Sequence, residues 1–236
     1  MDKDYAKYLL NKTTQDYNLI AKHFSGAREK PWQEFSFLFT DFLSSGEKVL
    51  DIGCGNGRFF ELCKGKASYF GIDSSKELIK IAKNRYSEAN FQVADALNLP
   101  FSDNYFDKVY SIAVLQHIPS QEFREQFLKE AKRVLRPDGL LFLTVWNLWK
   151  WKNIELLIKN NILKLFGKSK LDFKDFFLPV KRHSLFKNFY YHAFTKKELE
   201  KLVKKAGFQI EKSGLITMSF GKKTQSNFYI IAKNKT

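Results

Sequence analysis

The residues best placed to do chemistry in this sequence are three aspartates, each at the end of a short apolar run. Asp51 is followed by the loop Gly53-Cys54-Gly55-Asn56-Gly57, Asp73 ends the second run, and Asp95, followed by Ala96, ends the third. Short apolar runs predict buried strands, and the glycines predict a tight loop that lets a ligand approach the backbone closely. An acid about 20 residues after such a loop is typical of ribose-diol recognition. The pattern predicts an α/β sheet that binds its ligand where the strands end.

The elements that have to position these aspartates alternate between helix and strand. Apolar periodicity predicts helices over residues 1–25, 33–43, 58–63, 74–85, 121–135 and 195–206. A strand ends at each aspartate, and further strands are predicted over 108–112, 140–146, 208–213 and 227–232, with a basic loop at 218–225. Ser74 to Glu77 and Thr195 to Glu198 have capping-box spacing, so the helices after them are expected to begin cleanly.

We expect one domain over residues 1–236, with a helical cap over about 1–45 and a basic insertion over about 147–191. In the insertion the alternation of helix and strand stops, and an apolar stripe of helical period runs from Ile154 to Leu165 between lysines. The segment is too long for an ordinary loop, so we expect it to lie over the ligand site. Its tryptophans and lysines suit a lid, a nucleic-acid-binding face or contact with a membrane surface.

Positive charge is concentrated in the last third of the chain. The formal net charge is +15, of which residues 1–147 carry +1 and residues 148–236 carry +14. This asymmetry favours a polyanionic partner that meets one part of the molecule, whereas a generally lysine-rich surface would spread its charge. The residues expected to contact nucleic-acid phosphates are Lys150, Lys152, Lys181, Arg182, Lys187, Lys222 and Lys223.

Composition argues against several classes of protein. Two cysteines, Cys54 and Cys63, predict no disulfide framework, and together with four scattered histidines they predict no metal site. No run approaches the ~18 apolar residues of a membrane span, and the polar N-terminus lacks a signal-peptide pattern. We therefore expect a cytoplasmic, metal-free protein without integral membrane association.

The pattern of glycines and aspartates resembles that of the class I S-adenosylmethionine (SAM)-dependent methyltransferases. A dinucleotide-binding or unliganded α/β domain is the alternative. The resemblance implies a Rossmann-like, doubly wound, seven-stranded sheet, mostly parallel with an antiparallel C-terminal strand pair, and SAM as cofactor with S-adenosylhomocysteine as product. It implies that Asp51 orients the loop, Asp73 takes the ribose hydroxyls, and Asp95 and Ala96 meet the adenine. The full implied cofactor set is Tyr17, Asp51, Gly53, Cys54, Gly55, Asp73, Ser74, Asp95, Ala96, Ser111 and Ala113.

The segment after the fourth predicted strand narrows the chemistry. Ser111 to His117 lacks the Asn/Asp-Pro-Pro-aromatic motif that orients an amine in N-methyltransferases. No cysteine stands where a base-carbon methyltransferase keeps its nucleophile, and no acidic cluster suggests a magnesium-dependent enzyme. Methylation of oxygen without a metal remains.

Further segments resemble the tRNA wobble-uridine carboxymethyl methyltransferases, which esterify 5-carboxymethyluridine at position 34. These segments are Tyr17 to Trp32, Ser111 to His117, Val134 to Pro137, Leu143 to Trp146, Asp175 to Pro179 and Tyr190 to Phe194. The chain departs from the family pattern at Ala27, Gln116, Asp138, Val180 and Phe189. The resemblance implies tRNA as partner, and eukaryotic members of the family also work with a small zinc-binding activator protein.

The acceptor in this reaction is a carboxylate, which is already ionised at pH 7 and needs positioning rather than a base. A cationic fork with hydroxyl or imidazole donors would fix it. The candidates for this pocket are Arg28, His117, Tyr191 and His192. Each has a structural alternative: a surface ion pair, a packing residue, or anchors of the insertion. Trp32 and Trp146 are core aromatics or base-stacking platforms.

Two other functions fit the same residues. One is a SAM-dependent O-methyltransferase of a small metabolite, in which the basic insertion is only a lid. The other is a SAM-binding partner subunit without its own catalysis. Salt-sensitive binding of bulk tRNA would favour the tRNA enzyme over the metabolite enzyme. Methyl transfer to any acceptor would exclude the non-catalytic subunit.

Overall fold

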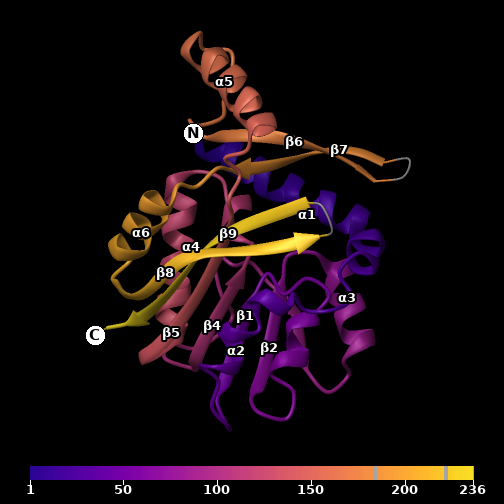
Figure 1. Ribbon diagram of the computed structural model, residues 1–236, viewed down its shortest axis with the longest axis vertical. Coiled ribbons are helices and arrows are strands. Elements are labelled where there is room, and N and C mark those ends of the chain that lie inside the picture. Colours follow the sequence, from indigo (N-terminus) through magenta and orange to yellow (C-terminus); the bar gives the residue numbers. More distant parts are fainter. Residues whose placement is uncertain (183–184, 221–222, 236) are drawn as a thin grey trace.

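A seven-stranded sheet organises the chain (Figure 1). The computed structural model describes residues 1–182, 185–220 and 223–235, without the side chains of residues 152, 180–182, 185, 186, 220 and 223. The strands of the sheet are β1 (Lys48–Ile52), β2 (Ser68–Asp73), β3 (Asn90–Val93), β4 (Phe106–Ile112), β5 (Leu135–Trp146), β8 (Phe208–Phe220) and β9 (Lys223–Asn234). Their order is β3-β2-β1-β4-β5-β9-β8, with β1 to β5 parallel and β9 antiparallel to both neighbours. The predicted α/β class and antiparallel C-terminal pair are confirmed.

Helices cover both faces of this sheet. The described helices are α1 (Lys3–Gly26), α2 (Phe37–Thr40), α3 (Lys76–Arg85), α4 (Gln121–Val134), α5 (Trp151–Leu165) and α6 (Lys196–Lys205), with 3-10 turns at Gln33–Phe35, Arg58–Leu62 and Leu115–His117. One core cluster joins α4 and α6 to one face of the sheet, and a second joins α2 and α3 to the other. The central strands are therefore buried on both sides, which explains their nearly continuous apolar sequence.

Aromatic stacking fixes the second core. The ring of Phe39 on α2 stacks on Tyr110 of β4 with centroids 4.1 Å apart, and Tyr110 stacks on Phe142 of β5 at 4.5 Å. The Tyr110 hydroxyl donates to the carbonyl of Leu38, so this buried polar group is satisfied. These contacts hold β4 and β5 in the places from which their carboxyl ends reach the site.

One of the two predicted helix N-caps is confirmed, and the other lies one residue later in the chain than predicted. Thr195 and Glu198 form the expected reciprocal capping box of α6. At α3 the N-cap is Ser75, whose hydroxyl accepts from the backbone N–H of Leu78. Ser74 is thereby released from capping and stands at the edge of the site.

Two segments differ from the sequence prediction. Strands β8 and β9 form a long hairpin whose pairing runs through residues 218–220 and 223–225, so the predicted basic loop at 218–225 is wrong. Ile216 and Met218 are buried in the second core, and this burial extends β8. Residues 33–43, predicted as one helix, form a 3-10 turn and the short α2, which bury Phe35, Leu38 and Phe39.

Between β5 and α6 the chain forms a separate layer above the sheet (Figure 1). Helix α5 is followed by an antiparallel hairpin of β6 (Asp175–Arg182) and β7 (Leu185–His192). The hairpin contacts α5 on one side and α1 on the other. None of the described helices is long and apolar enough to cross a bilayer.

Candidate functional site

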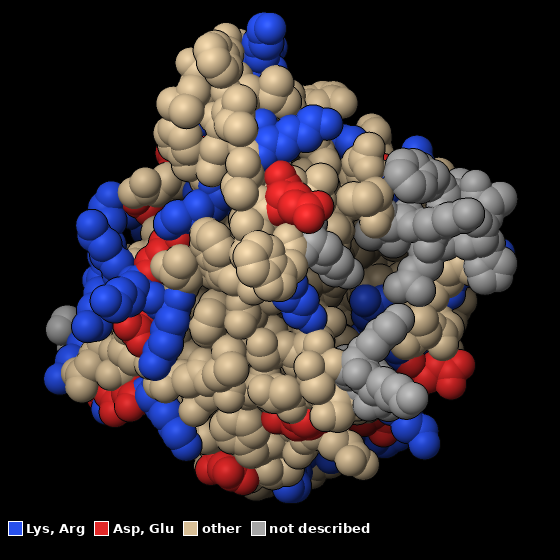
Figure 2. All heavy atoms as spheres, turned by 45° about the horizontal axis from the view of Figure 1, so that its top comes forward, with Lys and Arg blue, Asp and Glu red and all other residues tan. Residues whose placement is uncertain are grey.

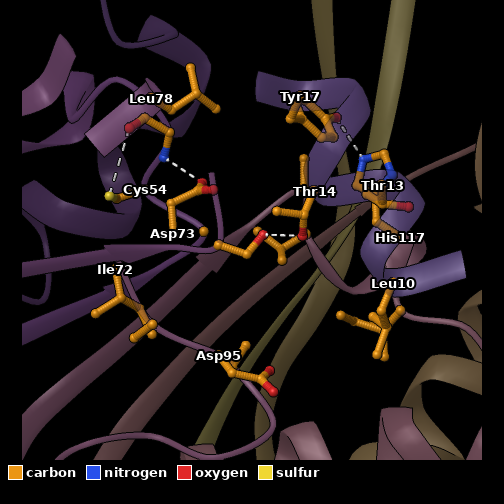
Figure 3. A pocket seen from close by; sticks show the side chains of 18 of the residues that line it. Leu10, Thr13, Thr14, Tyr17, Cys54, Ile72, Asp73, Leu78, Asp95 and His117 are labelled. Atoms are coloured by element: carbon orange, nitrogen blue, oxygen red, sulfur yellow. Dashed lines mark hydrogen bonds between the residues drawn. The ribbon is translucent and has the colours of Figure 1, made fainter. Parts of the chain in front are cut away.

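A cavity of about 930 Å³ lies between α1 and the carboxyl ends of β1, β2, β3 and β4 (Figure 3). Ligand pockets commonly measure ~300–1,000 Å³, so the cavity has room for a nucleoside-containing cofactor and part of a second ligand. In an open α/β sheet the ends of the strands are the usual place for a ligand. Of the residues predicted for cofactor and catalysis, those that line the cavity are Tyr17, Arg28, Gly53, Cys54, Gly55, Asp73, Ser74, Asp95, Ala96, Ala113 and His117.

The glycine loop forms one wall of the cavity, and there is no room for a side chain at Gly53. Gly53 has φ 75°, and a Cβ there would lie 2.4 Å from a methyl carbon of Val114. The N–H groups of Gly53 and Cys54 both donate to the carbonyl of Ile72, at 2.7 and 2.9 Å. The loop is thus tied to the end of β2, beside Asp73.

Asp73 links the glycine loop to α3. Its Oδ2 accepts from the Gly55 N–H at 3.0 Å, and its Oδ1 accepts from the Ser75 N–H at 2.8 Å. Burial raises the pKa of Asp73, while these two hydrogen bonds oppose the shift. Asp95, at the next strand end, accepts from the Leu97 N–H at 2.8 Å. Figure 3 shows both carboxylates at the sheet edge, facing the helix that carries Tyr17.

Two predicted cofactor residues lie behind the cavity wall. Asp51 is buried below the glycine loop and accepts a 2.5 Å hydrogen bond from the Tyr69 hydroxyl. Burial raises the pKa of Asp51 to about 7. Ser111 is fully buried on β4, and its hydroxyl has no partner among the described residues.

Helix α1 forms the roof of the cavity. Thr14 donates to the Ser74 hydroxyl at 2.9 Å, and the Asn18 side-chain oxygen accepts from Ser75 Oγ at 2.8 Å and from the Glu77 N–H at 3.2 Å. These bonds fasten the roof to the start of α3. Sequence reasoning missed most of its inner face, which comprises Lys3, Lys7, Leu10, Asn11, Thr13 and Thr14. Their spacing of three and four residues is helical, but the mixture of polar and apolar types hides the stripe from an apolar-periodicity search.

Tyr17 and His117 join the roof to the loop after β4. The Tyr17 hydroxyl lies 3.0 Å from His117 Nε2, and His117 Nδ1 lies 3.3 Å from the backbone carbonyl of Tyr190. A carbonyl can only accept, so Nδ1 carries the proton and Nε2 accepts from the phenol. Burial, together with the nearby Arg28, lowers the pKa of His117 to about 4. His117 is therefore a neutral side chain with both nitrogens engaged.

A cationic, aromatic end completes the cavity. The Arg28 guanidinium lies 4.3 Å from the ring centroid of Phe24, and the Arg58 guanidinium lies 4.1 Å from that of Trp32. All four side chains line the cavity. Arg58 follows the third glycine directly, yet sequence reasoning missed it, because an arginine at the start of a helix carries no distinctive signal.

Tyr191 and His192 do not line the cavity but support it. Tyr191 stacks on Trp146, a lining residue, with centroids 5.4 Å apart, and its ring lies 4.7 Å from that of His117. His192 is buried between two carboxylates, with Nδ1 2.6 Å from Asp175 and Nε2 2.9 Å from Glu198. Its ring thereby ties the hairpin to the start of α6.

Basic side chains lie at the periphery of this face. Lys150 donates to the carbonyl of Thr224 at 3.0 Å, and Lys187 lies on β7. The side chains of Lys152, Lys181, Arg182, Lys222 and Lys223 lie outside the described residues. In Figure 2 lysines and arginines gather along the side where Figure 1 places α6. The exposed lysines of α6 are Lys196, Lys197, Lys201, Lys204 and Lys205.

Comparison with known proteins places this architecture in a class. A family model described as a methyltransferase domain matches residues 50–143. A solved SAM-dependent methyltransferase from Methanosarcina mazei superposes with a TM-score of 0.72 and 26% identity, covering 84% of this chain and 97% of that one. The partner of the Trm112 methyltransferase activator from Haloferax volcanii shares the fold, with a TM-score of 0.68, 16% identity and coverage of 95% and 98%. The chain thus contains a methyltransferase domain.

A curated relative makes the comparison more specific. The tRNA (carboxymethyluridine(34)-5-O)-methyltransferase of Arabidopsis thaliana is 39% identical over 130 residues, which is 55% of this chain and 31% of that protein. The chain therefore spans about a third of the length of this relative.

Proposed function

We propose that this protein transfers a methyl group from SAM to the carboxylate of 5-carboxymethyluridine at the wobble position of tRNA. The observation that carries the proposal is the composition of the cavity, which has aspartates suited to a nucleoside at one end and arginines suited to a carboxylate at the other. The named tRNA methyltransferase with 39% identity to this chain supports the same acceptor.

The residues fit SAM. Asp73 keeps carboxylate oxygens at the edge of the cavity for a ribose diol. Asp95 and Ala96 stand at the next strand end, where an adenine would follow the ribose. Gly53 and Gly55 line the cavity without side chains, so the methionyl part could approach their backbone closely. Ala113 would border the methyl group.

Methylation of a carboxylate needs no proton transfer, and the site is consistent with that. When bound, SAM supplies an electrophilic methyl group on a sulfonium. The acceptor carboxylate is ionised at neutral pH, and its oxygen forms the new C–O bond as the C–S bond breaks. His117 is neutral with both nitrogens engaged, so it stabilises the arrangement rather than acting as a base. The contribution of the protein is alignment of the two reactants, which can be worth about 7–11 kcal/mol.

We assign Arg28 to the acceptor carboxylate because an arginine fork matches a carboxylate in shape and charge. Trp146, backed by Tyr191, offers an aromatic surface on which a splayed-out base could stack. Tyr191 and His192 act in this proposal by holding the wall in place. The lysines of α6, with Lys150 and Lys187, would contact tRNA phosphates.

The experiment is methyl transfer from labelled SAM to bulk tRNA that lacks the wobble ester, followed by nucleoside analysis. An alkali-labile methyl ester on the wobble uridine is the expected product. Asp73→Asn is the matched control, in which the label should fall in parallel with SAM affinity. The assay is run with and without a Trm112-type activator, because one structural neighbour is the partner of such an activator. Lack of label in both arms, with protein that binds SAM, would favour a small-metabolite acceptor.

A further inference from the structure

Arg58 is a buried cation, and two of its three guanidinium nitrogens have no hydrogen-bond partner among the described residues. It lines the cavity, only 6% of its surface is exposed, and its Nε and Nη1 have no hydrogen-bond partner within the described part of the chain. Most buried polar groups in folded proteins are paired, and a buried guanidinium with unpaired donors is costly to maintain. Such a group indicates a ligand that accepts hydrogen bonds from its unpaired N–H groups.

The packing around Arg58 fixes the orientation of its donors. The guanidinium lies over the ring of Trp32 at 4.1 Å from the centroid and near that of Phe59 at 4.9 Å. Aromatic rings contact the flat face of a guanidinium, while its N–H donors lie in the plane at the edge. The rings therefore satisfy the faces of Arg58 and leave its edge for an anion.

No carboxylate among the described residues forms an ion pair with Arg58. Asp51 is an acid whose charge acts on Arg58, but its Oδ2 already accepts from Tyr69, and burial raises the pKa of Asp51 to about 7. The second cation, Arg28, lies close enough to repel Arg58, and burial with this repulsion lowers the pKa of Arg58 to about 9. Arg58 is still cationic at neutral pH, so this end of the cavity carries two positive charges.

We propose that Arg58 binds a carboxylate of a ligand in the cavity through its unpaired N–H donors. The proposed function brings two carboxylates to the cavity: the methionyl carboxylate of SAM and the carboxymethyl group of the acceptor. The assignment to the acceptor rests on the proposed function. Both carboxylates present the same chemistry to a guanidinium. The test therefore measures carboxylate preference separately for each ligand.

The cofactor arm compares S-adenosylhomocysteine with 5′-methylthioadenosine, which shares the nucleoside and sulfur but lacks the amino-acid end. Calorimetric affinities are measured for the wild type, Arg58→Gln, Arg58→Lys and the remote control Arg136→Gln. If Arg58 holds the methionyl carboxylate, Arg58→Gln lowers the affinity for S-adenosylhomocysteine at least tenfold and leaves that for 5′-methylthioadenosine unchanged. Arg58→Lys should recover part of the loss, and Arg136→Gln should match the wild type.

The acceptor arm compares 5-carboxymethyluridine with its neutral amide, 5-carbamoylmethyluridine, in the presence of S-adenosylhomocysteine. If Arg58 holds the acceptor, Arg58→Gln removes the preference for the acid and leaves the ratio of the two cofactor analogues at its wild-type value. The proposal is overturned if Arg58→Gln changes neither preference, or if it weakens all ligands equally, as a purely structural role would. Failure of the proposed function is a separate result, namely no ester on tRNA from the wild type, and leaves the cofactor arm fully informative.

Discussion

The hydroxyl of Tyr17 donates to Nε2 of His117 across 3.0 Å, and this bond joins the roof helix to the loop after β4. The same imidazole donates from Nδ1 to the carbonyl of Tyr190 on the hairpin. One neutral ring thus connects three segments that are far apart in the sequence. The ring of Phe189, at one of the departures from the family pattern, packs against Tyr17 at 5.3 Å and covers this junction.

Removing the hydroxyl of Tyr17 should destabilise this junction. In Tyr17→Phe the buried Nε2 of His117 loses its donor, and an unsatisfied buried group costs about 1–3 kcal/mol. We expect a loss of this size in the free energy of unfolding, measured by urea denaturation. Tyr8→Phe is the matched control because Tyr8 is on the same helix and 56% exposed. Equal stability of the two variants would contradict the assigned bond.

His117 should make folding stability depend on pH. Its pKa is about 4 in the folded protein, mainly through burial, against 6.5 ordinarily. The unfolded chain therefore binds a proton first, so the contribution of His117 is complete above pH 6.5 and declines as pH falls toward 4, by up to about 3 kcal/mol. His117→Gln should flatten the pH dependence of the free energy of unfolding between pH 7 and 5 relative to the wild type. An NMR titration of the His117 ring with a midpoint near 6.5 would refute this.

Crowding, rather than backbone strain alone, should make Gly53 sensitive to substitution. Gly53→Ala forces a side chain into φ 75° and places its Cβ 2.4 Å from Val114. Gly46→Ala is the matched control, because φ there is 83° but nothing lies within 4 Å of the added Cβ. We expect Gly46→Ala to cost about 1–2 kcal/mol of stability, and Gly53→Ala to cost more and to abolish S-adenosylhomocysteine binding in calorimetry. Equal costs and retained binding would show that the loop accommodates the methyl group.

The lysines of α6 should carry tRNA affinity without affecting the cofactor. Reversing charge at Lys197, Lys201 and Lys204 should weaken tRNA binding and make it less sensitive to salt, because phosphate contacts release counterions. The same reversal at the exposed Lys76, Lys80 and Lys83 of α3, a different helix of this protein, is the control with equal charge. Filter binding at two salt concentrations measures the effect, and calorimetry measures S-adenosylhomocysteine affinity. If the α3 variant loses as much tRNA affinity as the α6 variant, the binding face is misplaced.

The sheet and the acidic strand ends were predictable because their signals are local. Asp73 and Asp95 follow short apolar runs, and both line the cavity as the alternation of strands and helices implied. The proposed roles of Arg28 and His117 depend on the family resemblance, and the structure places both side chains at the cavity.

The remaining features arise from tertiary contacts that no local pattern encodes. The inner face of α1 mixes lysines, threonines and asparagine, so only its position over the strand ends shows what it lines. The β8–β9 hairpin extends through polar residues because the alternate side chains Ile216 and Met218 are buried in the second core. His192 resembles a catalytic residue in sequence, yet its buried environment is set by Asp175 and Glu198, 17 and 6 residues away.

The bonds of Thr14 and Asn18 to the start of α3 have a consequence for the rate at which ligands come and go. These bonds and the one between Tyr17 and His117 fasten α1 over the strand ends, so a movement of α1 that widens the cavity has to break them. Breaking these bonds adds to the barrier for opening the cavity, so a ligand held under α1 has a longer residence time. The turnover of such an enzyme would then be limited by how often its first helix lifts.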